Sequence, residues 1–303
     1  MLDVLVEQHH KLSFSASVDL ANQQLGSKLR MYFDEKACSG EAQTASEIIE
    51  TIEAQRSTGR PRSNIENVAK RTRRWLIWRD EIKSGQYFDK EDSFRQIDRH
   101  DSEVVRGHTA GVNRWVDRIC LGMDADGNID AGGLLGPVSE GKRPETGTVA
   151  LPAANTTDHG GTGMTIAKLR AARLKLATDE NDLDRMTVNV AITPNQTDDI
   201  LAIVEAAGSN INLLDQDALK SGRIPGLIGF RFVETNLLYK DGNIRSCPVW
   251  TQDHVCLGVW EDVNGKIWND GSADNLPYAK VCATMDATRK KDEGVHILEC
   301  DES

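Results

Sequence analysis

The chain has 303 residues, of which 39% are hydrophobic and 27% are charged, and its net charge is −11. This length is sufficient to bury a sizeable core in one large domain or two small ones, and the acidic balance argues against free diffusion onto nucleic acid as the main task. No run of about 18 apolar residues is present, which excludes a membrane-spanning helix. The first residues lack the pattern of a secretion signal, so we expect synthesis in the cytoplasm.

The chain begins with two segments that do not look like a closed domain. Residues 1–40 contain only short apolar pieces, which predict an arm that rests on another surface. A basic segment lies between Arg56 and Arg79, with eight basic residues and one acidic residue; its local charge of +7 leaves −18 for the rest of the chain. Apolar side chains on both faces of residues 75–78 predict a strand covered by a partner. Residues 83–86 predict a turn.

The basic segment predicts a docking arm that contacts a second copy of the chain. Its tryptophans would be costly to leave exposed, and the acidic remainder of the chain offers a complementary surface, for which the tract at residues 178–217 is one candidate. A charged strand exposed to solvent is the alternative interpretation. The residues that we expect to make the contact are Arg71, Arg73, Arg74, Trp75, Trp78 and Arg79.

A long amphipathic helix is predicted next, starting near residue 97. Its apolar stripe has alternating spacings of 4 and 3 residues and consists of Val105, Thr109, Val112, Val116, Ile119 and Met123. Of these residues, we expect Val105, Val112, Val116 and Ile119 to make the main packing contacts. Gly107 and Gly111 each cost the helix about 1 kcal/mol. Either packing along the stripe offsets this cost, or another group approaches the backbone closely there.

The second half of the chain predicts an α+β fold with few helices and several antiparallel strands. A loop-like region at residues 124–163 precedes a helix that starts at Thr165 and a half-buried strand at residues 188–192. The next helix has Thr193 as its N-cap, Pro194 at N1, Gln196 at N3 of a capping box and Gly208 at its end. The remaining predicted elements are strands at residues 230–233 and 255–259, a hairpin turn at residues 264–265, and a final hairpin that pairs residues 283–286 with residues 295–298.

The chemical motifs in the sequence all have simpler interpretations. MDADGNIDAGG places acidic residues as in an EF-hand, but Ile129 and Leu135 stand where Gly and a bidentate Glu are required, so we predict an acidic turn. GLLGPVSEGK lacks the Ser or Thr of a phosphate-binding loop. The six cysteines are far apart, which is typical of reduced, mostly buried thiols, and Cys247, His254 and Cys256 lack a fourth zinc ligand. We therefore predict no catalytic residue, no metal and no cofactor.

Several segments, in order along the chain, resemble the major capsid proteins of tailed bacteriophages, which share the Johnson fold (the Hong Kong ninety-seven-type capsid fold). QQLGSKLR (23–30) is similar to the start of the family's body, and RTRRWLIWRDEIKSGQYFD (71–89) is similar to its extended loop. HTAGVNRWVDRICLG (108–122) resembles the spine helix of the peripheral domain. GLIGFRFVETNLL (226–238) and MDATRKKDEGVHILEC (285–300) are similar to later strands of the family. The resemblance covers nearly the whole chain.

This resemblance implies a structural protein without enzymatic activity that assembles as hexamers and pentamers into an icosahedral shell around double-stranded DNA. It implies a virion location after assembly in the host cytoplasm, with scaffolding, portal and decoration proteins as possible separate partners and no membrane. The implied organisation is an N-terminal arm at 1–40, an extended loop at 41–96, a peripheral domain at 97–185, an axial domain with a central mixed sheet flanked by helices at 186–275, and closing peripheral strands at 276–303. The alternative is a soluble α+β enzyme or nucleic-acid-binding module with no recognisable site motif.

Overall fold

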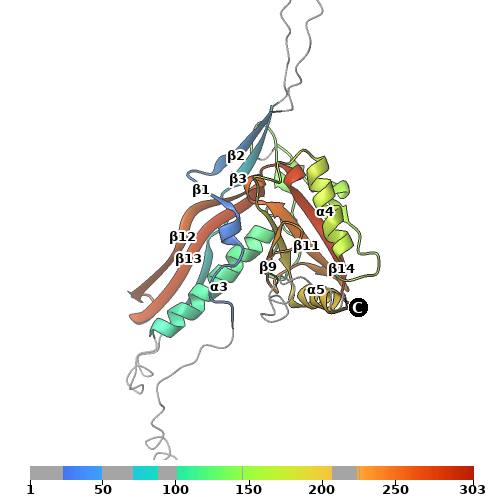
Figure 1. Cartoon of the computed structure of the whole chain (residues 1–303). Coiled ribbons are helices and arrows are strands. Elements are labelled where there is room, and N and C mark those ends of the chain that lie inside the picture. The colour runs from blue at the N-terminus through green and yellow to red at the C-terminus, as the bar shows by residue number, and fades with distance from the viewer. Residues whose placement is uncertain (1–22, 50–70, 88–100, 145, 207–223, 225) are drawn as a thin grey trace, which may run out of the picture.

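The computed structural model describes residues 23–49, 71–87, 101–144, 146–206, 224 and 226–303. Figure 1 shows two sheets, each with its own helices, and a two-stranded ribbon that projects from them. Within the described ranges, no helix is long and apolar enough to cross a membrane. The elements are η1 (Arg30–Tyr32), β1 (Asp34–Ala37), β2 (Ala42–Ile49), β3 (Arg71–Ile77), β4 (Ile82–Tyr87), α3 (Asp101–Leu121), β5 (Val138–Ser139), β6 (Thr148–Val149), η2 (Ala153–Asn155), β7 (Thr156–Thr157), α4 (Ile166–Thr178), β8 (Val188–Ile192), α5 (Pro194–Ala206), β9 (Phe230–Glu234), β10 (Lys240–Asp241), β11 (Ile244–Thr251), η4 (Gln252–His254), β12 (Val255–Asp270), β13 (Leu276–Arg289), η5 (Asp292–Gly294) and β14 (Val295–Asp301).

The first sheet has the strand order β1-β12-β13-β4 and is covered by α3, which packs against β13, β4 and β12. The apolar stripe of α3 makes this contact: Val112 and Val116 are buried, and Val105 and Ile119 pack against the core at its margin. At Gly111 an added Cβ would meet only the Arg114 side chain, at 3.8 Å. Side-chain packing, rather than a close approach to the backbone, therefore accounts for this stretch of the helix. The start near residue 97 lies outside the described residues.

The C-terminal end of α3 requires glycine. Gly122 follows the helix with a φ of +78°, a conformation that side chains disfavour. A Cβ at this position would lie 2.2 Å from the carbonyl oxygen of Gly132. The close approach brings the loop around residues 130–136 against the end of the helix, where its carbonyl groups become available to a buried arginine described below.

The second sheet has the strand order β7-β14-β11-β8-β9, with α4 packed against β14 and β7 and α5 against β8. All five residues of β8 are buried, so the prediction of a half-buried strand was wrong. The strand lies inside the sheet rather than at its margin, and its two faces are both covered. The predicted start of α4 is confirmed, because the Thr165 side chain accepts a hydrogen bond from the backbone N–H of Lys168.

The structure shows one of the two hydrogen bonds that define the predicted capping box of α5. The backbone N–H of Thr193 donates to Oε1 of Gln196 at 3.0 Å, as the motif requires. The Thr193 hydroxyl donates to the same oxygen, while Nε2 of Gln196 donates to Glu302 at 2.8 Å. The cap therefore also attaches the helix to the C-terminal strand region. The predicted end at Gly208 lies outside the described residues.

Three turn predictions were wrong because they relied on local sequence. Residues 83–86 lie inside β4, which pairs with β13. The Asn-Gly pair at 264–265 lies within β12, whose 16 residues continue to Asp270 before the hairpin turn. The final hairpin does not exist, because β13 pairs with β12 and β4, whereas β14 pairs with β11 and β7 in the other sheet.

The segment before β1 attaches to α3 through one buried carboxylate. Asp117 is fully buried and accepts hydrogen bonds from the backbone N–H groups of Lys28 and Leu29 at 3.1 and 3.0 Å, and from the Ser27 hydroxyl at 2.5 Å. Nε2 of Gln24 donates to it as well. Leu29 and Phe33 are then buried in the core, where Phe33 lies against Trp250 of β11. This segment therefore connects α3 to the second sheet.

Candidate functional site

The described part of the basic segment contributes β3, one strand of a ribbon that projects from the body of the molecule (Figure 1). β3 pairs antiparallel with β2, from Ala42 opposite Ile77 to Ile49 opposite Arg71. Arg71 and Arg73 approach the same carboxylate, Glu47, at 4.0 and 3.6 Å, and their side chains remain 66% and 47% exposed. Two arginines facing one exposed carboxylate leave this face of the ribbon positively charged, and such exposed pairs contribute about 0–1 kcal/mol each.

Arg74 behaves differently from its two neighbours because it is buried within its own subunit. Its guanidinium lies 2.7 Å from a carboxylate oxygen of Glu140 and 2.8 Å from one of Asp292. Asp292 also accepts a hydrogen bond from Nε of Arg289 at 2.9 Å. One carboxylate thus holds two buried arginines and joins the base of the ribbon to the end of β13.

Arg289 is the inner member of this network, which we call the Asp292 network (Arg74, Glu140, Arg289 and Asp292). Its side chain is fully buried and donates to the carbonyl groups of Leu134 and Gly136 at 2.8 and 2.7 Å. Burial lowers the pKa of Arg289, although Asp292 acts in the opposite direction, and a guanidinium stays protonated in proteins. The arginine therefore ties the loop after α3 to the first sheet.

A second buried carboxylate holds the end of β3. Asp286 of β13 accepts a hydrogen bond from the backbone N–H of Ile77 at 3.0 Å and from Nε of Arg79 at 2.6 Å. Burial raises the pKa of Asp286 and outweighs the opposing effect of Arg79. Arg79 also donates to the carbonyl of Ala131 at 2.7 Å. The chain leaving the ribbon is therefore bound to the same subunit.

The two tryptophans of the predicted arm have different surroundings. Nε1 of Trp75 donates to the carbonyl of Gly141 at 2.9 Å, within the same chain. Trp78 is 50% exposed and lies edge-to-face against Trp260, with ring centroids 6.0 Å apart. All six predicted docking residues have a contact within their own subunit, but Arg74, Trp75 and Arg79 are the more deeply held. Arg71, Arg73 and Trp78 stay about half exposed or more.

The predicted acidic tract is only partly described. Asp179 pairs with Lys175 at 2.7 Å and Asp182 with Arg185 at 3.4 Å, while Asp199 accepts the backbone N–H of Met164 at 2.7 Å. Residues 207–217 of the tract lie outside the described residues. Three acids of the tract, Asp179, Asp182 and Asp199, therefore have a partner within the subunit.

The acidic motif after α3 and the cysteines have the structures that the sequence predicted. Asp124 accepts a hydrogen bond from the backbone N–H of Asn128 at 2.8 Å, which forms the predicted acidic turn and lowers the pKa of Asp124. Five of the six cysteines are buried, as expected for reduced thiols in a core. The sequence did not point to the grouping of Glu81, Glu261 and Cys282, which lie just before β4, in β12 and in β13. Lys280 lies 2.6 Å from Glu81, so an ion pair already supplies positive charge there.

A buried histidine makes the stability of the subunit depend on pH. Burial lowers the pKa of His296 from 6.5 to about 4, and Lys175 adds to this effect. The unfolded chain therefore binds a proton that the folded chain excludes. The free energy of unfolding should be highest above pH 6.5. It should fall between pH 6.5 and about 4, with a slope of up to about 1.4 kcal/mol per pH unit.

Urea titrations at pH values of about 7.5 and 5 measure this effect, with His296→Gln as the comparison. The variant should lose part of the pH dependence, because glutamine does not titrate. The neutral imidazole has Thr157 as a hydrogen-bond partner at 2.7 Å, which the amide can keep. Equal pH slopes in the two proteins would show that His296 does not contribute.

Comparison with known proteins identifies the family. The sequence matches the phage capsid protein family over residues 6–302, which is nearly its whole length. The chain belongs to the phage capsid protein family. A comparison with curated proteins finds no match.

Solved phage capsid structures share the fold of this capsid protein. The capsid of Ralstonia phage GP4 superposes with a TM-score of 0.69 at 12% identity, covering 97% of this chain and 96% of that one. The capsid of a native GTA particle gives 0.68 at 9% identity, with 95% and 96% covered. Mycobacterium phage Che8 gives 0.67 at 12% identity, with 94% and 96% covered. The predicted α+β Johnson-type fold is therefore confirmed.

Proposed function

We propose that this phage capsid protein is the major subunit of an icosahedral head, assembled as hexamers and pentamers around double-stranded DNA. The family match over residues 6–302 is the observation that carries this proposal. The proposal assigns the chain a structural role in the virion and no reaction. Assembly would take place in the host cytoplasm, with scaffolding, portal and decoration proteins as separate partners.

The projecting ribbon supports a role in contacts between copies. Its base is fixed by the Asp292 network and by Asp286, while Arg71, Arg73 and Trp78 stay exposed. A rigid base lowers the entropy lost when a projecting element binds. We therefore assign the docking role to these three residues, with Trp78 as the apolar anchor and the arginines facing carboxylates of a neighbour.

The charge of the chain also fits DNA packaging. At a net charge of −11, most of the surface repels phosphate, so DNA would be enclosed without being held on the wall. The exposed arginines of the ribbon favour one competing function, a nucleic-acid-binding module. Such a module predicts DNA binding that weakens steeply with salt.

Size-exclusion chromatography and negative-stain imaging of the purified full-length chain test the proposal. We expect capsomers or closed shells, formed without added nucleic acid. A small species that binds DNA with a steep salt dependence would instead favour the nucleic-acid-binding module and overturn the capsid assignment.

Replacing Trp78, the proposed apolar anchor just after the end of β3, should block assembly without unfolding the subunit. We expect Trp78→Ala to reduce the yield of shells about tenfold or more, because removal of a buried aromatic anchor at an interface costs about 2 kcal/mol or more. The melting temperature of the subunit should stay close to that of the unaltered protein, since Trp78 is half exposed. Trp78→Phe keeps the aromatic surface and is the matched control. Normal shells from Trp78→Ala would show that Trp78 does not anchor the contact between copies.

A further inference from the structure

A groove of about 610 Å³ lies beside the base of the ribbon. Its walls come from four parts of the chain: the residues that follow β3, the C-terminal end of α3, the loop after α3, and β13. We call it the acidic groove and define it by six of its lining residues, which are Trp78, Asp80, Trp115, Asp124, Asp130 and Asp286.

The lining of the acidic groove carries an excess of negative charge. It contains four aspartates and one arginine, Arg79, which corresponds to a formal charge of −3. Asp286 is buried and accepts a hydrogen bond from Nε of Arg79 at 2.6 Å. Asp130 lies 3.6 Å from the same guanidinium and stays more than half exposed. Asp80 is exposed and makes no hydrogen bond or ion pair with the described residues. The groove can therefore accept further positive charge.

The acidic groove also has features that proteins use to hold a guanidinium group. Trp78 is half exposed and Trp115 is half-buried. Arginine side chains stack favourably on the face of tryptophan, and Arg118 already lies over the Trp115 ring, 5.7 Å from its centroid. The C-terminal end of the 21-residue helix α3 adds partial negative charge at the same place. A planar cationic group is therefore the chemistry that fits this groove.

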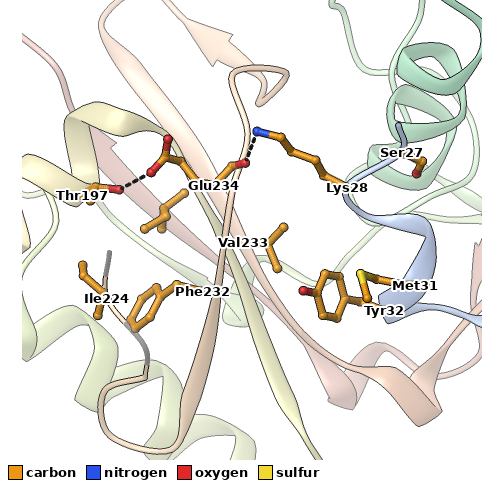
Figure 2. Close-up of a pocket in the computed structure, with 10 residues that line it drawn as sticks. Ser27, Lys28, Met31, Tyr32, Thr197, Ile224, Phe232, Val233 and Glu234 are labelled. Carbon is orange, nitrogen blue, oxygen red and sulfur yellow. Dashed lines mark hydrogen bonds between the residues drawn. The ribbon is translucent and has the colours of Figure 1, made fainter. Parts of the chain in front are cut away.

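Three other grooves lined by described residues lack this charge. The groove beside β9 (Figure 2) contains one lysine and one glutamate, and Nζ of Lys28 already donates to the carbonyl of Glu234 at 2.9 Å. The groove at the start of β2 contains one glutamate and one arginine. The groove on α4 contains two arginines and no acidic residue. Among these grooves, only the acidic groove attracts a cationic surface.

The ribbon carries the matching groups. Arg71 and Arg73 lie two residues apart in β3, so their side chains share one face of the strand. Both approach Glu47, at 4.0 and 3.6 Å, and both stay exposed. One carboxylate does not neutralise two guanidinium groups, and exposed ion pairs of this kind contribute little. The arginines can therefore leave Glu47 for a more acidic partner at small cost.

The ribbon cannot fill the acidic groove of its own subunit. Arg71 lies seven residues before Trp78, which corresponds to about 23 Å along an extended strand. Pairing with β2 holds this stretch extended, and the backbone N–H of Trp78 itself donates to the carbonyl of Glu41 at 2.8 Å. The distance is much greater than the reach of an arginine side chain. The ribbon that enters the groove must therefore belong to a second copy.

We propose that Arg71 and Arg73 of one copy dock into the acidic groove of the next copy. The guanidinium groups face the carboxylates of Asp80 and Asp130, and Trp78 packs against them. Because the ribbon and the groove are different surfaces of one chain, the contact is head-to-tail, as a closed ring of copies requires. This inference rests on the proposed function and names the surface that receives the ribbon.

An exchange of charge between ribbon and groove tests the contact in the full-length chain. Arg73→Glu should lower the yield of capsomers about tenfold or more, and so should Asp80→Arg, because each places like charges opposite one another. A chain with both substitutions restores opposite charges at every contact and should recover most of the yield. Such a recovery cannot arise within the ribbon, because position 80 lies outside it.

The control for the charge exchange is Asp241→Arg. It makes the same change at an exposed position of β10, outside the acidic groove, and should leave the yield of capsomers close to that of the unaltered chain. The melting temperature of each purified subunit shows whether the variant is folded.

Crosslinking gives a second measurement. One preparation carries Arg73→Cys and the other Asp80→Cys, and the two are mixed before assembly, so a link between these positions forms only between copies. A bifunctional maleimide is used, because an arginine–aspartate contact holds the two Cβ atoms further apart than a disulfide permits. Docked positions react at a high effective concentration. We expect linked dimers, located by mass spectrometry, at about tenfold the yield of a mixture of Arg73→Cys with Asp241→Cys.

The outcomes separate this inference from the proposed function. Capsomers of the unaltered chain, with neither the recovery nor the link, would overturn the ribbon contact and leave the capsid assignment intact. Loss of capsomers in Asp80→Arg but not in Arg73→Glu would show that the groove receives a different cation, from elsewhere in the chain or from a separate protein, and would overturn the assignment to the ribbon. Absence of any assembly from the unaltered chain would overturn the proposed function and this inference with it.

Discussion

Asp292→Ala is expected to lower the free energy of unfolding of the subunit by about 3–5 kcal/mol, because it leaves two buried arginines without their shared carboxylate. Arg74 would keep Glu140, at 2.7 Å, but Arg289 would keep only backbone carbonyl groups. Urea unfolding of the purified subunit measures the change.

The adjacent residue supplies the control for this experiment. Glu293 is exposed and one position away, so Glu293→Ala removes the same charge without disturbing the network, and we expect a change within about 0.5 kcal/mol. If both variants unfold at the same urea concentration, the Asp292 network does not stabilise the subunit. A loss confined to Asp292→Ala would show that the base of the ribbon is held by the subunit itself before any neighbour is bound.

Asp117→Ala is expected to cost about 2–4 kcal/mol, because several donors lose one acceptor in a buried position. The backbone N–H groups of Lys28 and Leu29 are among them, and Leu29 lies fully buried beside α3. The segment that connects α3 to the second sheet should therefore loosen. Amide hydrogen exchange at residues 28 and 29 should speed up more than exchange in α4.

Asp117→Asn distinguishes the loss of the acceptor from the loss of the charge. The amide keeps one oxygen at the same place, so we expect a smaller loss of stability than for Asp117→Ala. Equal losses in both variants would show that the charge, rather than the hydrogen bonds, holds the segment on α3. Unchanged exchange at residues 28 and 29 would contradict the proposed connection.

Several elements could be predicted because their signals are local. The 4-and-3 spacing of apolar residues marked α3, and Val112 and Val116 are buried as that stripe requires. Thr165 and Thr193 marked two helix starts, since a cap depends only on residues within one turn. The overall fold followed from the order of several such pieces, which resembled a known capsid architecture.

Strand pairing could not be predicted in the same way. Alternation of apolar and polar residues assigns side chains to faces, but it does not identify the strand that will lie alongside. Asn264 and Gly265 have the composition of a tight turn, yet β12 continues through them because β13 pairs with both sides of this point. The burial of β8 could not be predicted for the same reason. It depends on the position of the strand inside the sheet, where both of its faces are covered.

By itself, the sequence determined that the chain has a concentrated basic segment, a long amphipathic helix and an α+β composition, since charge and periodicity are properties of neighbouring residues. Only the tertiary structure decided which of the arginines of β3 stay exposed. Arg71, Arg73 and Arg74 share one strand, but Arg74 meets Asp292, which lies 218 positions away in the sequence. Such a contact depends on which strands pair across the fold, and the residues around Arg74 carry no information about that pairing.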